Sequence, residues 1–145
     1  MKPPPNDWPR ISSALYYTDP AKAIDWLCEA FGFEVRIKVV DDDGQIQHSE
    51  LTLGGGLIMV AGEQDRHEPR VPSKSPRSID GAVTQCLAIY VDDADALCER
   101  ARAAGAIIAS EPETTDHGED YWADRGFRAV DPDGHHWWFM QRVRG

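Results

Sequence analysis

Two histidines and one glutamate have the clearest capacity for chemistry in this sequence. His48 and Glu50 are two positions apart, so in a β-strand both side chains would point to one face, and His136 would join them if it faced the same cleft. Imidazole and carboxylate groups bind divalent metal ions, so one interpretation of this set is a metal site. The other interpretation, which we favour, is that His48 and Glu50 hydrogen-bond within a polar pocket.

The cysteines, serines and glycines give little sign of catalysis. Cys28, Cys86 and Cys98 are odd in number and have no Cys-x-x-Cys spacing, so they predict free thiols in a reducing compartment, the cytoplasm. No serine lies in a nucleophile-elbow motif, and the glycines at 54–56 are not followed by the Lys-Ser/Thr pair of a phosphate-binding loop. The sequence therefore identifies no catalytic residue.

An aromatic-rich hairpin near the C-terminus is the segment around which the rest of the chain is arranged. Residues 131–134, Asp-Pro-Asp-Gly, have the types of a tight turn, and residues 126–130 and 135–143 on either side favour strands. Side chains alternate along a strand. One face carries His136, Trp138 and Met140, and the other carries His135, Trp137 and Phe139. Because both faces are bulky, we expect one to pack under a helix and the other to line a cavity, with Trp138 as its main wall.

Two helices are predicted to support this hairpin and its neighbours. The first begins after Asp19, with Pro20 in its first turn, and ends at Gly32. The second begins after residues 92–93, Asp-Asp, and ends at Gly105. Their apolar stripes are Ile24, Leu27, Cys28 and Phe31, and Ala94, Leu97, Cys98, Ala101 and Ala104. The helices are of equal length and have matching ends, which indicates an internal repeat.

Strands surround each helix in the same order, which gives two βαβββ modules. The predicted strands are residues 11–17, 33–40, 46–53 and 57–61, then 85–91, 106–110, 121–130 and 135–143, with an acidic loop at 111–119. The fold class is therefore α+β, with both modules forming a curved mixed sheet around a central cleft. The single domain, 1–145, divides into module 1 (11–62), a linker (63–82) and module 2 (83–143). The linker forms either a lid or a disordered segment.

The composition excludes several classes of partner. Acidic residues outnumber basic ones 25 to 15, for a net charge of −10, which disfavours nucleic acid and anionic membrane surfaces. Neither a signal peptide nor an apolar run long enough to span a bilayer is expected. A small molecule, aromatic or cationic, is the expected partner.

Four segments together resemble the vicinal oxygen chelate superfamily, which includes glyoxalase I, bleomycin-resistance proteins and extradiol dioxygenases. They are Tyr17-Thr18-Asp19-Pro20, Phe31-Gly32-Phe33, Tyr90-Val91-Asp92-Asp93-Ala94-Asp95 and Asp131-Pro132-Asp133-Gly134-His135. The resemblance runs from Ile11 to Arg142 and implies the paired-module fold. It also implies a homodimer, because relatives often complete their clefts across subunits.

In the metal-dependent branches of this superfamily, His, Gln or Glu side chains from both modules hold one divalent ion. The resemblance places the corresponding positions at Ser12 or Ser13, Cys86 or Gln85, Trp138, and Met59 or Val60. These residues differ from the expected ligands, and a tryptophan would fill the space of the ion. We therefore expect no cofactor and assign no metal ligand.

The resemblance thus predicts a metal-independent small-molecule-binding protein, similar to the drug-sequestering resistance proteins. The residues expected at its ligand site are Trp138, His136, Met140, Glu50, His48, Ser12, Cys86, Trp122 and Tyr121. The alternative is an enzyme, a metal-dependent lyase or isomerase of the glyoxalase type, with a displaced divalent-metal site that uses His48, Glu50 or His136.

Overall fold

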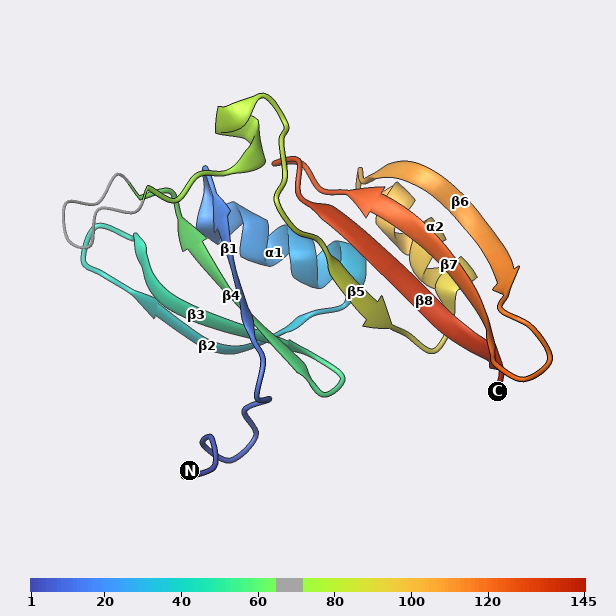
Figure 1. Cartoon of the computed structure of the whole chain (residues 1–145). Helices are drawn as coiled ribbons and strands as arrows, with labels where there is room; N and C mark the ends of the chain where they lie inside the picture. The colour runs from blue at the N-terminus through green and yellow to red at the C-terminus, as the bar shows by residue number, and fades with distance from the viewer. Residues whose placement is uncertain (65–71) are drawn as a thin grey trace.

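The computed structural model describes residues 1–64 and 72–145, and it forms two βαβββ modules (Figure 1). The first contains β1 (Ser13–Tyr17), α1 (Pro20–Phe31), β2 (Glu34–Val40), β3 (Ile46–Leu53) and β4 (Gly56–Gly62). The second contains β5 (Leu87–Tyr90), α2 (Ala94–Ala103), β6 (Ile107–Asp116), β7 (Ala123–Val130) and β8 (His136–Arg144). The predicted α+β class and repeat are confirmed.

Both helices begin with the caps that the sequence indicates. The Asp19 side chain accepts from the N–H of Lys22 at the start of α1, and the Asp93 side chain accepts from the N–H of Ala96 at the start of α2. Gly32 ends α1 with φ 79°, a left-handed conformation that suits glycine, and its N–H donates to the carbonyl of Cys28. These local signals fix where both helices start and where α1 stops. The expected equal lengths are wrong, because α1 has 12 residues whereas α2 has 10 and ends at Ala103, with Ala104 in a right-handed conformation.

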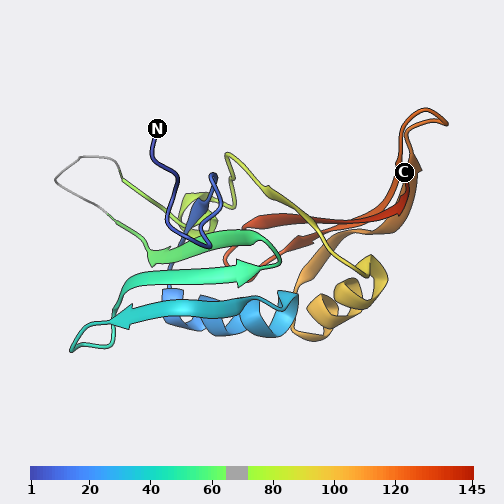
Figure 2. The same ribbon diagram turned by 90° about the horizontal axis from the view of Figure 1, so that it is seen from below.

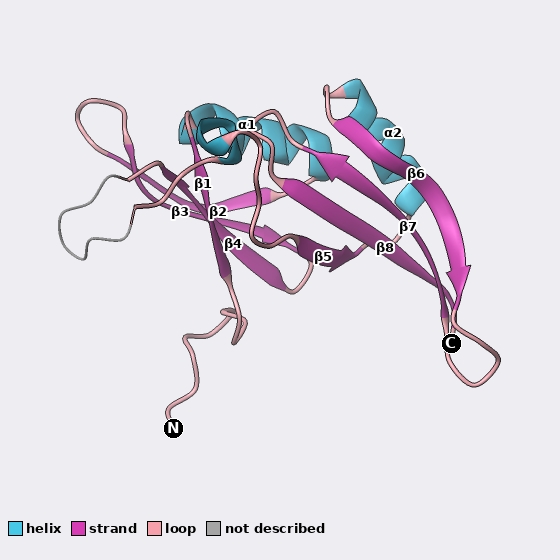
Figure 3. Cartoon of the chain, turned by 45° about the horizontal axis from the view of Figure 1, so that its top comes forward, coloured by secondary structure: helices cyan, strands magenta, loops and turns pink. Residues whose placement is uncertain are grey.

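Each module has a four-stranded mixed sheet. The strand orders are β1-β4-β3-β2 and β5-β8-β7-β6, with β1/β4 and β5/β8 parallel and the other pairs antiparallel. Figure 2 and Figure 3 show both helices on the same side of the two sheets. The sheets are not closed on each other, so their faces away from the helices stay open.

One hydrophobic core joins the modules beneath the sheets. Phe31 at the end of α1 contacts two side chains of β8, with ring centroids 5.2 Å from Trp137 and 4.7 Å from Phe139. Trp137 and Phe139 are 1% and 0% exposed. This confirms the prediction that one face of the last strand packs under a helix. One of the helices that contact this face is α1, which belongs to the other module.

Polar contacts also cross between the helices. Arg100 of α2 donates from Nε to the carbonyl of Glu29 at 2.7 Å and from Nη2 to the carbonyl of Cys28 at 3.0 Å. Trp26 of α1 donates from Nε1 to the carbonyl of Ala104 at 2.7 Å. The carbonyls at the C-terminal end of each helix are thus partly satisfied by the other module.

Two segments differ from, or fall outside, the sequence-based expectation. Residues 111–116, expected in an acidic loop, continue β6, which pairs with β7 through two register shifts around Ser110. These irregularities interrupt the alternation from which a strand is recognised. In the linker, Pro76–Ile79 forms a short 3₁₀ helix, η1, whereas residues 65–71 lie outside the described residues, so the choice between lid and disorder remains untested. No described helix is both long and apolar enough to cross a bilayer.

Candidate functional site

The open face of the second sheet is hollowed on the side away from α2. The hollow has a volume of about 550 Å³ and is floored by alternate residues of β8 and β7, including Trp138, Met140 and Gly126. A volume of this size fits a small organic molecule, since ligand sites commonly occupy about 300–1,000 Å³. We refer to it as the sheet hollow.

Large aromatic side chains line the sheet hollow and remain exposed. Tyr90, Trp122 and Trp138 are 52%, 39% and 38% exposed. Clustered exposed aromatic surface on a folded chain marks a place where another molecule binds more often than isolated apolar residues do. This arrangement agrees with the prediction that Trp138 lines a cavity while its neighbours in sequence are buried.

Asp124 holds two of these aromatic rings in place. Its Oδ2 accepts from the hydroxyl of Tyr90 at 2.8 Å and from Nε1 of Trp122 at 3.0 Å, and its Oδ1 accepts from Nε of Arg142 at 2.7 Å. Burial works to raise the pKa of Asp124, but the hydrogen bonds, first that from Arg142, outweigh it and keep the pKa below its ordinary value. The ionised carboxylate therefore fixes the orientation of one side of the hollow.

The absence of a side chain at Gly126 shapes the floor. A Cβ there would lie 2.8 Å from the carbonyl oxygen of Phe139 and 3.3 Å from Nε1 of Trp138. The indole of Trp138 therefore extends over the backbone of β7, where any larger residue would displace it. Glycine is required here by close approach and not by an unusual φ.

The open face of the first sheet carries the His48–Glu50 pair. His48 Nε2 lies 2.9 Å from Oε1 of Glu50, and Nη1 of Arg36 lies 3.2 Å from Oε2 of the same carboxylate. Glu50 is only 5% exposed. These residues form the hydrogen-bonded polar cluster that the favoured interpretation of the sequence describes, and Arg36 was not anticipated.

The sequence-predicted site residues lie in several places instead of one. Trp138, Met140 and Trp122 line the sheet hollow. His136 and Cys86 line another hollow beside residues 82–87, and Ser12 lines a third between the facing edges of the two sheets. Tyr121 is 63% exposed beside Trp122 and is not among the residues that line the sheet hollow.

The residues that correspond to metal ligands do not fit a divalent ion. Ser12, Cys86 and Trp138 line three different hollows, and the indole nitrogen of Trp138 carries a hydrogen and cannot ligate. The alternative positions Ser13 and Gln85 do meet, because Nε2 of Gln85 donates to Oγ of Ser13 at 3.1 Å, and both line one hollow with Cys86. Within residues 1–64 and 72–145, no three His, Cys, Asp or Glu side chains are placed to hold one ion. Glu50, the carboxylate of the displaced alternative, already accepts from an arginine.

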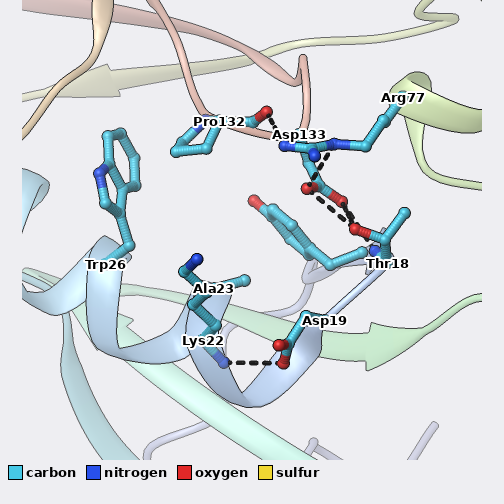
Figure 4. A pocket seen from close by; sticks show the side chains of 9 residues that line it. Thr18, Asp19, Lys22, Ala23, Trp26, Arg77, Pro132 and Asp133 are labelled. Atoms are coloured by element: carbon cyan, nitrogen blue, oxygen red, sulfur yellow. Dashed lines mark hydrogen bonds and ion pairs between the residues drawn. The ribbon is translucent and has the colours of Figure 1, made fainter.

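The Asp131–Gly134 turn is structural and ties the two modules together. Asp133 accepts from the N–H of Thr18 at 2.7 Å (Figure 4) and from the hydroxyl of Ser75 at 2.7 Å. Burial works to raise the pKa of Asp133, but these hydrogen bonds outweigh it and lower the pKa below its ordinary value. A smaller hollow of about 170 Å³ adjoins the turn, with Lys22 and Trp26 on its rim.

Sequence reasoning missed Tyr90, Asp124 and Arg128 as lining residues of the sheet hollow. One signal was available for Arg128, because the tight turn at 131–134 sets the hairpin register and places Arg128 opposite Trp138. No comparable signal exists for Tyr90. Its strand β5 pairs in parallel with β8, so no tight turn between the two strands sets their register.

Comparison with known proteins agrees with this geometry. Residues 10–139 match the model of the Glyoxalase/Bleomycin resistance protein/Dioxygenase superfamily. An uncharacterized protein of Mycobacterium bovis is 32% identical over 139 residues, which cover 94% of this chain and 85% of that protein. An uncharacterized protein of Mycobacterium tuberculosis has the same identity over the same length, which covers 76% of that protein.

Solved structures share the architecture. TioX from Micromonospora sp. ML1 superposes with a TM-score of 0.70 at 30% identity, covering 93% of this chain and 99% of TioX. A glyoxalase/bleomycin resistance protein/dioxygenase from Nocardioides has a TM-score of 0.64 at 19% identity, covering 94% of this chain and 85% of that chain, and shows likeness of fold alone.

Proposed function

The chain belongs to the Glyoxalase/Bleomycin resistance protein/Dioxygenase superfamily, and from this premise we propose that it binds a planar small molecule in the sheet hollow without a metal ion. The mode resembles that of drug-sequestering resistance proteins. The observation that carries the proposal is the gathering of Tyr90, Trp122 and Trp138, all exposed, around one hollow. An aromatic ligand would cover this apolar surface.

Preorganisation supports such binding. Asp124 orients Tyr90 and Trp122 by hydrogen bonds, and Gly126 gives the indole of Trp138 its place over β7. Side chains that are already ordered lose little conformational entropy when a ligand binds. Each aromatic contact adds about 0.5–1.5 kcal/mol beyond the burial of apolar area.

Replacement of Trp138 tests the proposal directly. We expect Trp138→Ala to weaken the binding of naphthalene-2-carboxamide, an uncharged bicyclic probe, by about tenfold, because the largest ring of the floor is lost. Isothermal titration calorimetry measures the affinity. Trp8→Ala is the matched control, since Trp8 lies in the N-terminal arm, outside the residues that line the hollow. Equal affinity of the Trp138 variant and the wild type would contradict the proposal.

The natural ligand can be sought by thermal shift. A compound that binds only the folded chain raises the melting temperature by mass action. A panel of metabolites, antibiotics and divalent metal ions would distinguish a metal-independent binder from a metal protein. We expect aromatic compounds to raise the melting temperature and metal ions alone to leave it unchanged.

Assembly and location are part of the same proposal. Val35, Ile37, Val39 and Val40 of the edge strand β2 are each 40% or more exposed, and this apolar surface supports a homodimer in which a second copy covers it. Sedimentation velocity at micromolar concentration tests the dimer. The three cysteines are free, which supports a reducing compartment, the cytoplasm.

The alternative, a glyoxalase-type lyase or isomerase with a displaced metal site, has one observation in its favour, the contact between His48 and Glu50 at 2.9 Å. Metal analysis of protein purified without a histidine tag separates the two functions. A stoichiometric divalent ion that is lost in Glu50→Gln would favour the enzyme. We expect no stoichiometric ion in either protein, because Arg36 already neutralises Glu50.

A further inference from the structure

Arg128 lines the sheet hollow, and a second arginine, Arg142, lies beside the hollow and is fully engaged. Arg142 donates from Nε to Asp124 at 2.7 Å and from Nη2 to the hydroxyl of Tyr90 at 2.7 Å. Its guanidinium lies over the rings of Tyr90 and Trp122, at 5.2 and 5.3 Å from their centroids. The charge of Arg142 is balanced, and it covers these two ring faces.

Arg128 has an aromatic neighbour but no carboxylate partner. Its Cζ lies 5.2 Å from the ring centroid of Trp138, the residue directly opposite on β8. No described residue accepts a hydrogen bond from this guanidinium or forms an ion pair with it. A guanidinium that lies over an indole keeps the N–H groups at its edge free, and their fork matches the two oxygens of a carboxylate.

A second donor lies beside the first. The indole Nε1 of Trp138 has no acceptor among residues 1–64 and 72–145, and the side chain is 38% exposed in the hollow. An indole N–H is a donor only. Two neighbouring side chains that line the hollow therefore carry donors for which the described residues supply no acceptor.

The carboxylates of the hollow leave this pair available. Asp124 accepts three hydrogen bonds, and Glu111 is held by Arg102, with 2.6 Å between Nη2 and Oε2. Glu113 lies opposite Gly126, and no ion pair joins it to Arg128 in the described part of the chain. Among the described residues, Arg128 therefore carries an unbalanced positive charge on this floor, and Glu113 carries an unbalanced negative charge on the adjacent strand β6.

From these contacts we infer that the ligand of the sheet hollow is an aromatic carboxylate, an inference that rests on the proposed function. Its ring packs among the exposed aromatic side chains, and its carboxylate accepts from Arg128 and from the indole N–H of Trp138. The guanidinium of Arg128, which lies over the ring of Trp138, would repel a cationic ligand. The net charge of −10 opposes an anion only weakly, since charges beyond about 8 Å are screened at physiological ionic strength.

Three probes of one shape test the inference on the full chain by isothermal titration calorimetry. They are naphthalene-2-carboxylate, naphthalene-2-carboxamide and naphthalen-2-ylmethylammonium. We expect the carboxylate to bind about tenfold or more tighter than the amide, and the ammonium to bind most weakly, because charge-assisted hydrogen bonds form only with the anion. This comparison uses wild-type protein and does not depend on the folding of a variant.

Arg128→Gln should remove the preference for the carboxylate over the amide. Arg125→Gln is the matched control, because Arg125 lies on the other face of β7, bound to Asp95, and its loss should keep the preference. An amide or ammonium that binds as tightly as the carboxylate, or a preference that survives in Arg128→Gln, would overturn the inference while the proposed function stands. Failure of all three probes to bind would overturn both.

Discussion

At the scale of the residue, the floor of the sheet hollow depends on the absence of a side chain at Gly126. A Cβ on Gly126 would lie 2.8 Å from the carbonyl oxygen of Phe139, closer than atoms pack without displacement, and 3.3 Å from the indole nitrogen of Trp138. The carbonyl belongs to the backbone of the paired strand, so relief requires the strands to separate. The indole can move only by leaving the floor.

We expect Gly126→Ala to lower the free energy of unfolding by about 1–3 kcal/mol, the usual cost of overpacking. It should also weaken the binding of naphthalene-2-carboxamide, since Trp138 is displaced. Urea denaturation and calorimetry measure the two effects. Gly55→Ala is the control, because a Cβ at Gly55 meets nothing within 4 Å. Loss of stability without loss of binding would show that Trp138 is not displaced.

Residue patterns in the sequence predicted part of this site. Alternation along the last strand indicated that Trp138 and Met140 face a cavity and that Trp137 is buried. This inference needs only the rule that successive side chains of a strand point to opposite faces. The pairing of Arg128 with that tryptophan required the hairpin register, and the contact of Asp124 with Tyr90 required the position of β5, which local sequence does not specify.

At the scale of the element, the helices were the most predictable part of the fold. The caps Asp19 and Gly32 satisfy backbone groups within a few residues, so their effect can be predicted from the sequence without knowledge of tertiary contacts. The second half of β6 could not be predicted in this way, because Glu111–Asp116 is polar and gains its strand structure from pairing with β7. An edge strand of this kind is defined by its partner, and not by its own periodicity.

The end of α1 illustrates how one element depends on another. Its last carbonyls lie at the C-terminal pole of the helix dipole, where a cation is favourable. Arg100 of α2 supplies that cation, with Nε 2.7 Å from the carbonyl oxygen of Glu29. Nη1 of the same side chain would lie 3.0 Å from a Cβ at Gly32. The two helices therefore fix each other through one side chain.

We expect Arg100→Gln to lower the free energy of unfolding by about 1 kcal/mol, because two hydrogen bonds to the carbonyls of α1 are lost. Chemical denaturation followed by circular dichroism measures the change. Arg102→Gln on the same helix is the control. Arg102 pairs with Glu99 and Glu111 at the surface, where ion pairs add little, so its loss should cost less. Equal effects of the two substitutions would argue against a special role for the contact with α1.

At the scale of the whole molecule, the Asp131–Gly134 turn between β7 and β8 joins the modules. The hydroxyl of Tyr17, at the end of β1, donates to Oδ2 of Asp131 at 2.6 Å, and Nε1 of Trp137 donates to the same oxygen at 3.1 Å. Tyr17 is 2% exposed and Asp131 is 3% exposed. This buried contact links the first strand of one module to the last hairpin of the other.

The buried hydroxyl of Tyr17 makes the union of the modules sensitive to alkali. Burial, followed by the neighbouring charge of Asp131, raises the pKa of Tyr17 well above its ordinary value of about 10. In the unfolded chain the phenol ionises near that ordinary value. The folded state therefore retains a proton that the unfolded state loses, so the contribution of Tyr17 to stability is complete below about pH 10 and declines as the pH rises above it.

We therefore expect the free-energy difference between wild type and Tyr17→Phe to be constant, at about 1–3 kcal/mol, below pH 10 and to shrink above it. Phenylalanine keeps the ring in the core but has no proton to lose. Urea denaturation at a series of pH values measures both profiles, and the cysteines, present in both proteins, cancel in the difference. Tyr121→Phe, at an exposed position, should follow the wild-type profile. If wild type and Tyr17→Phe lose stability in parallel above pH 10, the union of the modules does not depend on this proton.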